Sequence, residues 1–194
     1  MANVFALHSV GNSIVTWLRN VYPASLGGQT MPDCEFQQVA SGELDGSFGD
    51  GGTRITLLLY RVTVNEHARL QRPAGRDGAG PAPLNLDLHY LLTAWAGNAL
   101  DEQVTMAWAM RQLHEAPVLD ASSLSPDGGW ARDEVVQVIP AELSTEDLMR
   151  VWDALTPPYR LSVSYVARVV RLDAEAADGS AFRPVVARRL AYGR

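Results

Sequence analysis

The sequence contains no lysine, so all 16 of its basic residues are arginines. This absence excludes the lysine that closes a phosphate-binding P-loop, a Schiff-base lysine and a lysine general base. Cysteine occurs once, at Cys34, which excludes an internal disulfide and a metal site built from cysteines. Since no histidine or orienting group lies near it in the sequence, we interpret Cys34 as a small, buried or half-buried residue rather than a nucleophile.

Long apolar runs and an excess of positive charge are also missing. No run approaches the roughly 18 apolar residues that a membrane helix needs, and residues 1–22 lack the basic and apolar regions of a signal peptide. The net charge is -6, and phosphate binding requires clustered positive charge. We therefore expect a cytoplasmic protein with neither a nucleic acid nor a membrane as partner. Its 194 residues suffice for one well-buried core, so we expect a single domain over residues 1–194.

The sequence contains few candidate catalytic or metal-binding residues. Its four histidines show no metal-ligand spacing: His8, His67, His89 and His114. The best catalytic candidate is Asp87 with His89, which lie two apart on a predicted strand and therefore share a face, as in half of a catalytic triad. No G-x-S-x-G motif supplies a nucleophile. We expect no enzyme, no metal and no cofactor, with a hydrolase using Asp87 and His89 as the less favoured alternative.

Apolar spacing predicts helices alternating with strands. The predicted helices are 3–22, 98–115 and 144–155, and the predicted strands are 34–39, 54–66, 86–96, 134–139 and 159–173. Residues 41–52 and 118–131 are predicted loops. This order favours an α+β domain, with an antiparallel or mixed sheet and about three helices packed on it.

Three details of these elements are testable against a structure. Gly11 interrupts the apolar stripe of the first helix, a stripe that begins at Val4, and indicates close approach of another backbone. The second helix, capped by Asn98, is apolar on two faces, which predicts that it is sandwiched in the core or between subunits. The last strand alternates, with one face formed by Leu161, Val163, Tyr165, Ala167 and Val169.

Three segments are candidates for contacts with other proteins. Residues 67–85 are rich in Gly, Pro and Arg, which predicts a mobile hairpin tip whose Arg69, Arg72 and Arg76 become ordered against acidic partners. Trp130 follows two glycines in a predicted loop, and we expect it to be exposed at an interface. Residues 184–194 alternate like a strand, and they form either an arm that pairs with a neighbouring subunit or an ordinary final strand folded onto residues 160–172. The arm residues predicted to make contacts are Val185, Arg188, Arg189 and Tyr192.

Two blocks of the sequence resemble a known family. The first, residues 88–119, reads LHYLLTAWAGNALDEQVTMAWAMRQLHEAPVL, and the second, residues 139–170, reads IPAELSTEDLMRVWDALTPPYRLSVSYVARVV. Both are similar to the tail-terminator (cap) proteins of contractile injection systems of the antifeeding-prophage and virulence-cassette type, and the resemblance covers nearly the whole chain.

The resemblance implies a structural protein of a phage-tail-like particle. Such proteins form a ring, expected to be hexameric, that ends polymerisation of the inner tube and anchors the distal sheath layer. The implied partners are further copies of the chain, the sheath protein and the inner-tube protein, in a particle that assembles in the cytoplasm and either stays there or is released. A phage neck or completion protein, with the same ring geometry and a different partner, is the alternative.

Overall fold

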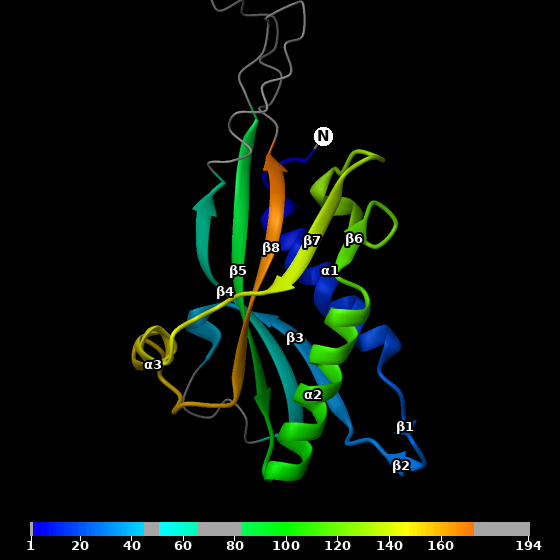
Figure 1. The fold of residues 1–194 in the computed structure, drawn as a ribbon, viewed down its shortest axis with the longest axis vertical. Helices are drawn as coiled ribbons and strands as arrows, with labels where there is room; N and C mark the ends of the chain where they lie inside the picture. The colour runs from blue at the N-terminus through cyan, green and yellow to red at the C-terminus, as the bar shows by residue number, and fades with distance from the viewer. Residues whose placement is uncertain (1, 45–50, 66–82, 173–194) are drawn as a thin grey trace, which may run out of the picture.

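The computed structural model describes residues 2–44, 51–65 and 83–172 (Figure 1). These residues form a six-stranded mixed sheet in the order β3-β4-β5-β8-β7-β6, three α-helices and a small separate hairpin, β1–β2. The pair β3–β4 is parallel and every other pair is antiparallel. The predicted α+β class is confirmed, with the sheet of the mixed kind.

The helices are α1 (Ala6–Val21), α2 (Ala99–Glu115) and α3 (Thr145–Asp153). The strands of the sheet are β3 (Cys34–Val39), β4 (Thr53–Val64), β5 (Leu84–Trp95), β6 (Val118–Asp120), β7 (Val135–Pro140) and β8 (Ser162–Leu172), and the hairpin strands are β1 (Ser25–Leu26) and β2 (Gln29–Thr30). Two short 3-10 helices, η1 (Ser41–Glu43) and η3 (Pro126–Gly128), complete the described elements. The predicted loop 118–131 therefore contains a strand and a 3-10 turn, because β6 gains its order only by pairing with β7.

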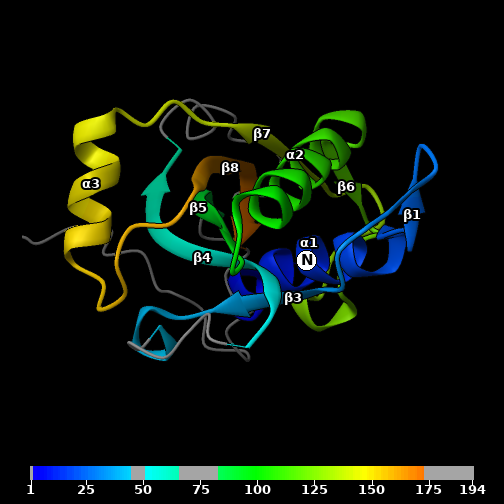
Figure 2. The same ribbon diagram turned by 90° about the horizontal axis from the view of Figure 1, so that it is seen from below.

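The sheet curls around α1 and α2, which fill its concave face, while α3 lies alone against the convex face (Figure 2). The main core occupies the concave side, where Leu88, Tyr90 and Leu92 of β5 are fully buried with Ile14 and Leu18 of α1. A smaller core lies under α3. It contains Trp152, Trp95, Leu91 and Leu58. Both faces of β5 near Trp95 are thus covered, whereas the end of β5 near Leu84 is not.

Helix α1 corresponds to the predicted helix 3–22 but is shorter at both ends. The middle of its apolar stripe is buried, but Val4 precedes the helix and is 72% exposed, and Val21 at the helix end is 40% exposed, so the places of these two residues in the stripe were wrong. At Gly11 the close neighbour is a side chain rather than a backbone: a Cβ there would lie 2.5 Å from Nε2 of Gln38 on β3. A larger residue at this position would therefore displace the amide end of the Gln38 side chain rather than the backbone of β3.

Helices α2 and α3 begin as their capping signals predicted. The side chains of Asn98 and Ser144 accept the amide hydrogens of Asp101 and Asp147, three residues further on. Within a single copy α2 is not sandwiched in the core, and burial between subunits stays a prediction. Its buried side chains form one broad face against the sheet, and Met110 of the supposed second face is exposed.

Two bulges change which face each residue occupies. In β4 the register shifts between Leu59 and Arg61, and in β8 the partners of Leu88 and Leu86 are Ala167 and Val170. The extra residue in β8 reverses the predicted alternation, so that Val170 is buried in the main core and Val169 is 39% exposed. A bulge arises from cross-strand pairing, which period-two alternation within one strand does not encode.

Candidate interaction surfaces

The predicted catalytic pair lies on the convex face, beyond the part that α3 covers. His89 hydrogen-bonds through Nε2 to Oγ1 of Thr63 at 3.0 Å, and the Asp87 carboxylate accepts two hydrogen bonds from the Asn65 amide at 3.0 Å. Asp87 and His89 both belong to the described part of the chain, and no hydrogen bond joins them. The shared face was predicted correctly, but each side chain is held by a neighbour on β4 or just beyond it rather than by the other.

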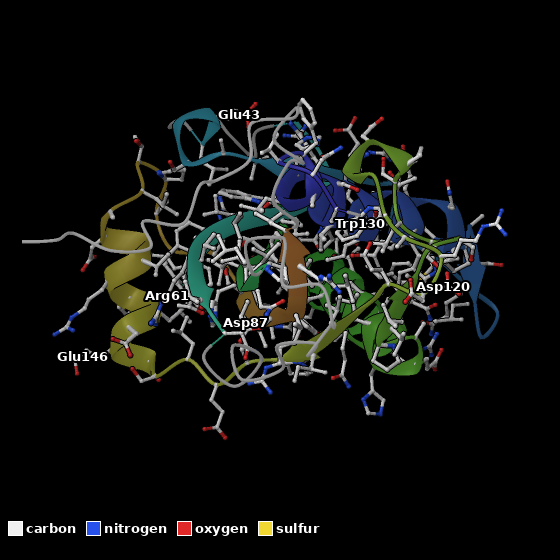
Figure 3. All side chains as sticks on the ribbon, turned by 90° about the horizontal axis from the view of Figure 1, so that it is seen from above. Glu43, Arg61, Asp87, Asp120, Trp130 and Glu146 are labelled. Carbon is white, nitrogen blue, oxygen red and sulfur yellow. The ribbon has the colours of Figure 1, made fainter. Side chains whose placement is uncertain are left out.

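The electrostatics of this region disfavour the protonated form of His89. Its pKa is lowered, first by desolvation and then by the positive charge of Arg61, with a smaller contribution from Arg168, and Asp87 only partly opposes these effects. The imidazole therefore stays neutral at pH 7. Seen along the sheet, Arg61 and Asp87 lie near each other on this face, while Trp130 lies on the side of α1 (Figure 3).

We call the exposed part of the convex face, formed by Arg61, Thr63, Asp87, His89 and Arg168, the polar half-face. Both arginines are exposed, and the other three side chains are partly buried. Its groups are either solvated charges or side chains bonded to a strand neighbour. This arrangement suits a contact with another protein better than it suits catalysis.

Cys34 lines a pocket of about 400 Å³ beside β3, together with Arg19, Glu35, Phe36 and Gln37. Burial raises the pKa of its thiol to about 12, so the thiol stays protonated and is a poor nucleophile. The prediction of a half-buried, structural cysteine is confirmed by its intermediate exposure.

Residues 2–44, 51–65 and 83–172 contain no cluster of three or more potential metal ligands. None of their helices is long and apolar enough to cross a lipid bilayer.

Trp130 is not the exposed loop residue that the sequence predicted. It is half-buried against the main core, and its indole Nε1 donates a hydrogen bond to Oγ of Ser9 on α1 at 2.9 Å. The hydroxyl of Ser9 in turn donates to the carbonyl of Ser125 at 2.8 Å. Trp130 thus attaches the η3 turn to α1, and Gly128 leaves room for its ring, since a Cβ there would collide with the indole. Gly128, one of the two glycines that suggested exposure, serves this packing instead.

An apolar surface that sequence reasoning missed lies at the end of the sheet where β4 ends and β5 begins. The side chains of Val62 and Val64 on β4 and of Leu84 on β5 are 42%, 51% and 47% exposed. They belong to the concave side, since Val62 and Val64 pair with the core residues Leu88 and Leu86. The predicted strand lengths contained a sign of this surface. The predicted strand 34–39 has about half the length of the predicted strand 54–66, so pairing between them leaves part of the longer strand uncovered.

The remaining predicted contact residues lie outside the described part of the chain. This holds for Arg69, Arg72 and Arg76 in the hairpin tip, and for Val185, Arg188, Arg189 and Tyr192 in the C-terminal segment. The described structure does bear on where that segment can bind. Strand β8 already pairs with β5 and, over Tyr165–Arg168, with β7. Both edges of β8 are therefore occupied over Tyr165–Arg168.

Comparisons with known proteins agree with this fold. A family model described as the Pvc16 N-terminal domain matches residues 9–187. No curated protein matches the chain. A cryo-EM structure of the sheath/tube terminator of an extracellular contractile injection system, PVC, in its extended state superimposes with a TM-score of 0.59 at 18% identity, and the match covers 96% of this chain and 63% of that one.

A second solved structure is the cap that terminates the tube of the anti-feeding prophage, determined by cryo-EM. It superimposes with a TM-score of 0.53 at 18% identity, covering 94% of this chain and 60% of that one. The present chain thus spans less than two thirds of the length of either protein. At this level of identity the two likenesses establish a shared fold.

Proposed function

The chain belongs to the family of the Pvc16 N-terminal domain, and on this premise we propose that it is a terminator subunit of a contractile injection system. In this role it ends polymerisation of the inner tube and holds the last layer of the sheath. The observation that carries the proposal is the family match over residues 9–187, which includes both sequence blocks that resemble tail terminators. The shared fold with two terminator structures supports the same role.

The described surfaces are compatible with a structural rather than a catalytic role. Asp87 and His89 are each held by a strand neighbour, and the Cys34 thiol stays protonated. What the chain does expose are contact surfaces: the polar half-face and the apolar end of the sheet around Val62 and Val64. We propose that these surfaces meet the sheath, the tube or further copies of the chain in a ring, with a hexamer as the expected stoichiometry.

The segments predicted from the sequence fit the same proposal. The arginines of the 67–85 tip would meet acidic partner surfaces, and the 184–194 segment would act as an arm to a neighbouring subunit. We treat residues 1–194 as one domain, because the described residues share one sheet with a core on each face. Assembly in the cytoplasm is proposed with the particle itself.

The test is to produce particles from the sheath, tube and baseplate proteins of the same gene cluster with and without this chain. With the chain present, negative-stain images should show tubes of uniform length inside extended sheaths, with density at the end away from the baseplate. Without it, tube lengths should vary and sheaths should fail to stay anchored. Uniform, stably sheathed tubes in its absence would refute the proposed function.

A further inference from the structure

The small core under α3 contains two nitrogen donors without an acceptor. Atom Nε1 of Trp152 and atom Nε of Arg160 are buried, and neither forms a hydrogen bond with any atom of the described residues. Trp152 itself is 4% exposed. Buried polar groups are almost always hydrogen-bonded, because an unmade bond costs free energy. Two unsatisfied donors in one cluster indicate that this site lacks an acceptor in the single subunit.

The guanidinium of Arg160 is held in place by an aromatic ring. Its Cζ atom lies over the ring of Trp95, 5.8 Å from the ring centroid. That ring is fixed in turn, since Trp95 is 1% exposed, donates from Nε1 to Oγ1 of Thr56 at 2.9 Å and packs edge-on against Trp152. A stacked arginine loses little further conformational freedom when it binds, so Arg160 is already oriented for pairing with an acceptor.

Arg160 has no carboxylate partner in the part of the chain that the structure describes. The ion pairs found there use Arg54, Arg111 and Arg150. Arg160 is partly exposed, and of its guanidinium nitrogens only Nε is both buried and unpaired, so the outer two can be reached from solvent. A half-buried cation without a counter-ion lowers the stability of the free subunit. We therefore expect Arg160 to meet its counter-ion in the assembled state.

The residues around Arg160 have the composition of the centre of a protein contact. Tyr159 is 48% exposed, and its ring packs against that of Trp152 at 5.9 Å between centroids. Arginine, tyrosine and tryptophan are the residues that most often dominate the binding energy of interfaces. Helix α3 and the chain that leads from it into β8 stand apart from the other helices, on the convex side of the sheet (Figure 2).

The group complementary to Arg160 is a carboxylate. A guanidinium offers only donors and a positive charge, in a planar fork that matches two carboxylate oxygens. A second copy of the chain supplies such groups: the sequence has 22 acidic residues against 16 arginines, so acids outnumber the arginines that can pair with them within one copy. Nucleic-acid phosphate, another common anion, is disfavoured by the net charge of -6.

We propose that Arg160 binds a carboxylate of a neighbouring copy of the chain. The inference rests on the proposed function, because it names one contact through which copies in the ring recognise each other. In a ring built by head-to-tail contacts, each copy offers Arg160 to one neighbour and a carboxylate to the other.

The test uses the absence of lysine from the sequence. Arg160→Lys keeps the positive charge and introduces the single side-chain amine of the chain. A zero-length carbodiimide reagent then joins that amine only to a carboxylate in direct contact with it. A mixture of unlabelled and isotope-labelled full-length copies should give crosslinked dimers, in which mass spectrometry finds position 160 joined to an Asp or Glu of the copy with the other label.

The matched control is Arg150→Lys, on α3 itself. Arg150 is exposed and already pairs with Glu146 of the same copy at 2.6 Å, so its crosslink should stay within one copy. Crosslinks between copies that are as frequent from position 150 as from position 160 would overturn the inference. So would crosslinks from position 160 that stay within one copy, that reach the sheath or tube protein of particles instead of a second copy, or that do not form.

A second variant separates the contact from folding. Arg160→Met removes the charge and keeps an apolar side chain over Trp95, so the melting temperature of the free chain should not fall. The dissociation constant for self-association, measured by analytical ultracentrifugation, should rise at least about tenfold. An unchanged dissociation constant, or a wild-type chain that does not self-associate, would refute the inference. Tubes that are still capped in these cases would leave the proposed function intact, whereas uncapped tubes with the wild-type chain would contradict that function separately.

Discussion

Replacing Ser9 by alanine should loosen the η3 turn from α1, because one hydroxyl makes two of the bonds that join them. Oγ of Ser9 accepts from the Trp130 indole at 2.9 Å and donates to the Ser125 carbonyl at 2.8 Å, and Ser9 is 1% exposed. Each bond contributes about 1 kcal/mol net, and the unpaired Ser125 carbonyl adds to the loss. Because Trp130 is only half-buried, its indole recovers some hydration, so we expect a total loss of about 2–3 kcal/mol in the free energy of unfolding.

The assay is urea or thermal unfolding followed by tryptophan fluorescence and circular dichroism. For a chain of this size the loss corresponds to a melting temperature lower by about 5–10 °C. Trp130→Phe should cost about 1 kcal/mol, and the double variant should show a coupling energy of about 1 kcal/mol with Ser9→Ala. Ser122→Ala, an exposed serine bonded to Asp120, is the control and should change stability by less than about 0.5 kcal/mol. Additive effects at Ser9 and Trp130 would refute the claim that the indole is tied to α1, and Trp130 would again be free for a contact with a partner.

Three further perturbations test other parts of the structure. Gly11→Ala should change the free energy of unfolding by less than about 1 kcal/mol in a denaturant titration, because the new Cβ meets only the amide end of the flexible Gln38 side chain and alanine favours the helix; a loss above about 2 kcal/mol would show that this amide is fixed in place. Trp152→Ala should cost about 3–5 kcal/mol and weaken the near-ultraviolet circular dichroism of the Trp95–Trp152 pair, since the ring fills the core under α3; unchanged stability would mean that α3 does not anchor there. His89 is neutral in the fold because its pKa is lowered, so the unfolded chain binds more protons, and stability should fall as the pH drops below about 6.5, whereas His89→Gln should flatten that dependence. The same His89→Gln variant should still cap particles, and loss of a saturable hydrolytic activity in it would revive the enzyme hypothesis.

Local signals in the sequence were sufficient for the three α-helices and the longer strands. Strand β3 begins and ends where its pattern predicted, and α2 and α3 start at the residues that Asn98 and Ser144 cap. Capping and alternation act within a few residues along the chain, so they can be recognised without knowing any tertiary contact. The family resemblance rested on contiguous blocks of the same kind, and the match over residues 9–187 confirms it.

Other outcomes depended on contacts between residues far apart in sequence. Ser9 and Trp130 are 121 positions apart, so nothing near Trp130 in the chain announces that α1 supplies its hydrogen-bond acceptor. The reversal at Val169 and Val170 follows from the pairing of β8 with β5, and a bulge is a property of two strands together.

The sequence by itself therefore determined the fold class, most helix and strand positions, the family, and the exclusion of lysine- and disulfide-based chemistry. The tertiary structure alone decided which surfaces remain for partners: it packed Trp130, half-buried, against α1, held Asp87 and His89 on separate neighbours, and left Val62 and Val64 beyond the described pairing of β3 with β4. The physical reason is the distance along the chain over which each kind of signal acts. Helix and strand signals act over a few residues, whereas exposure is set by whatever distant segment packs against a side chain, and β3 simply ends before it reaches the second half of β4.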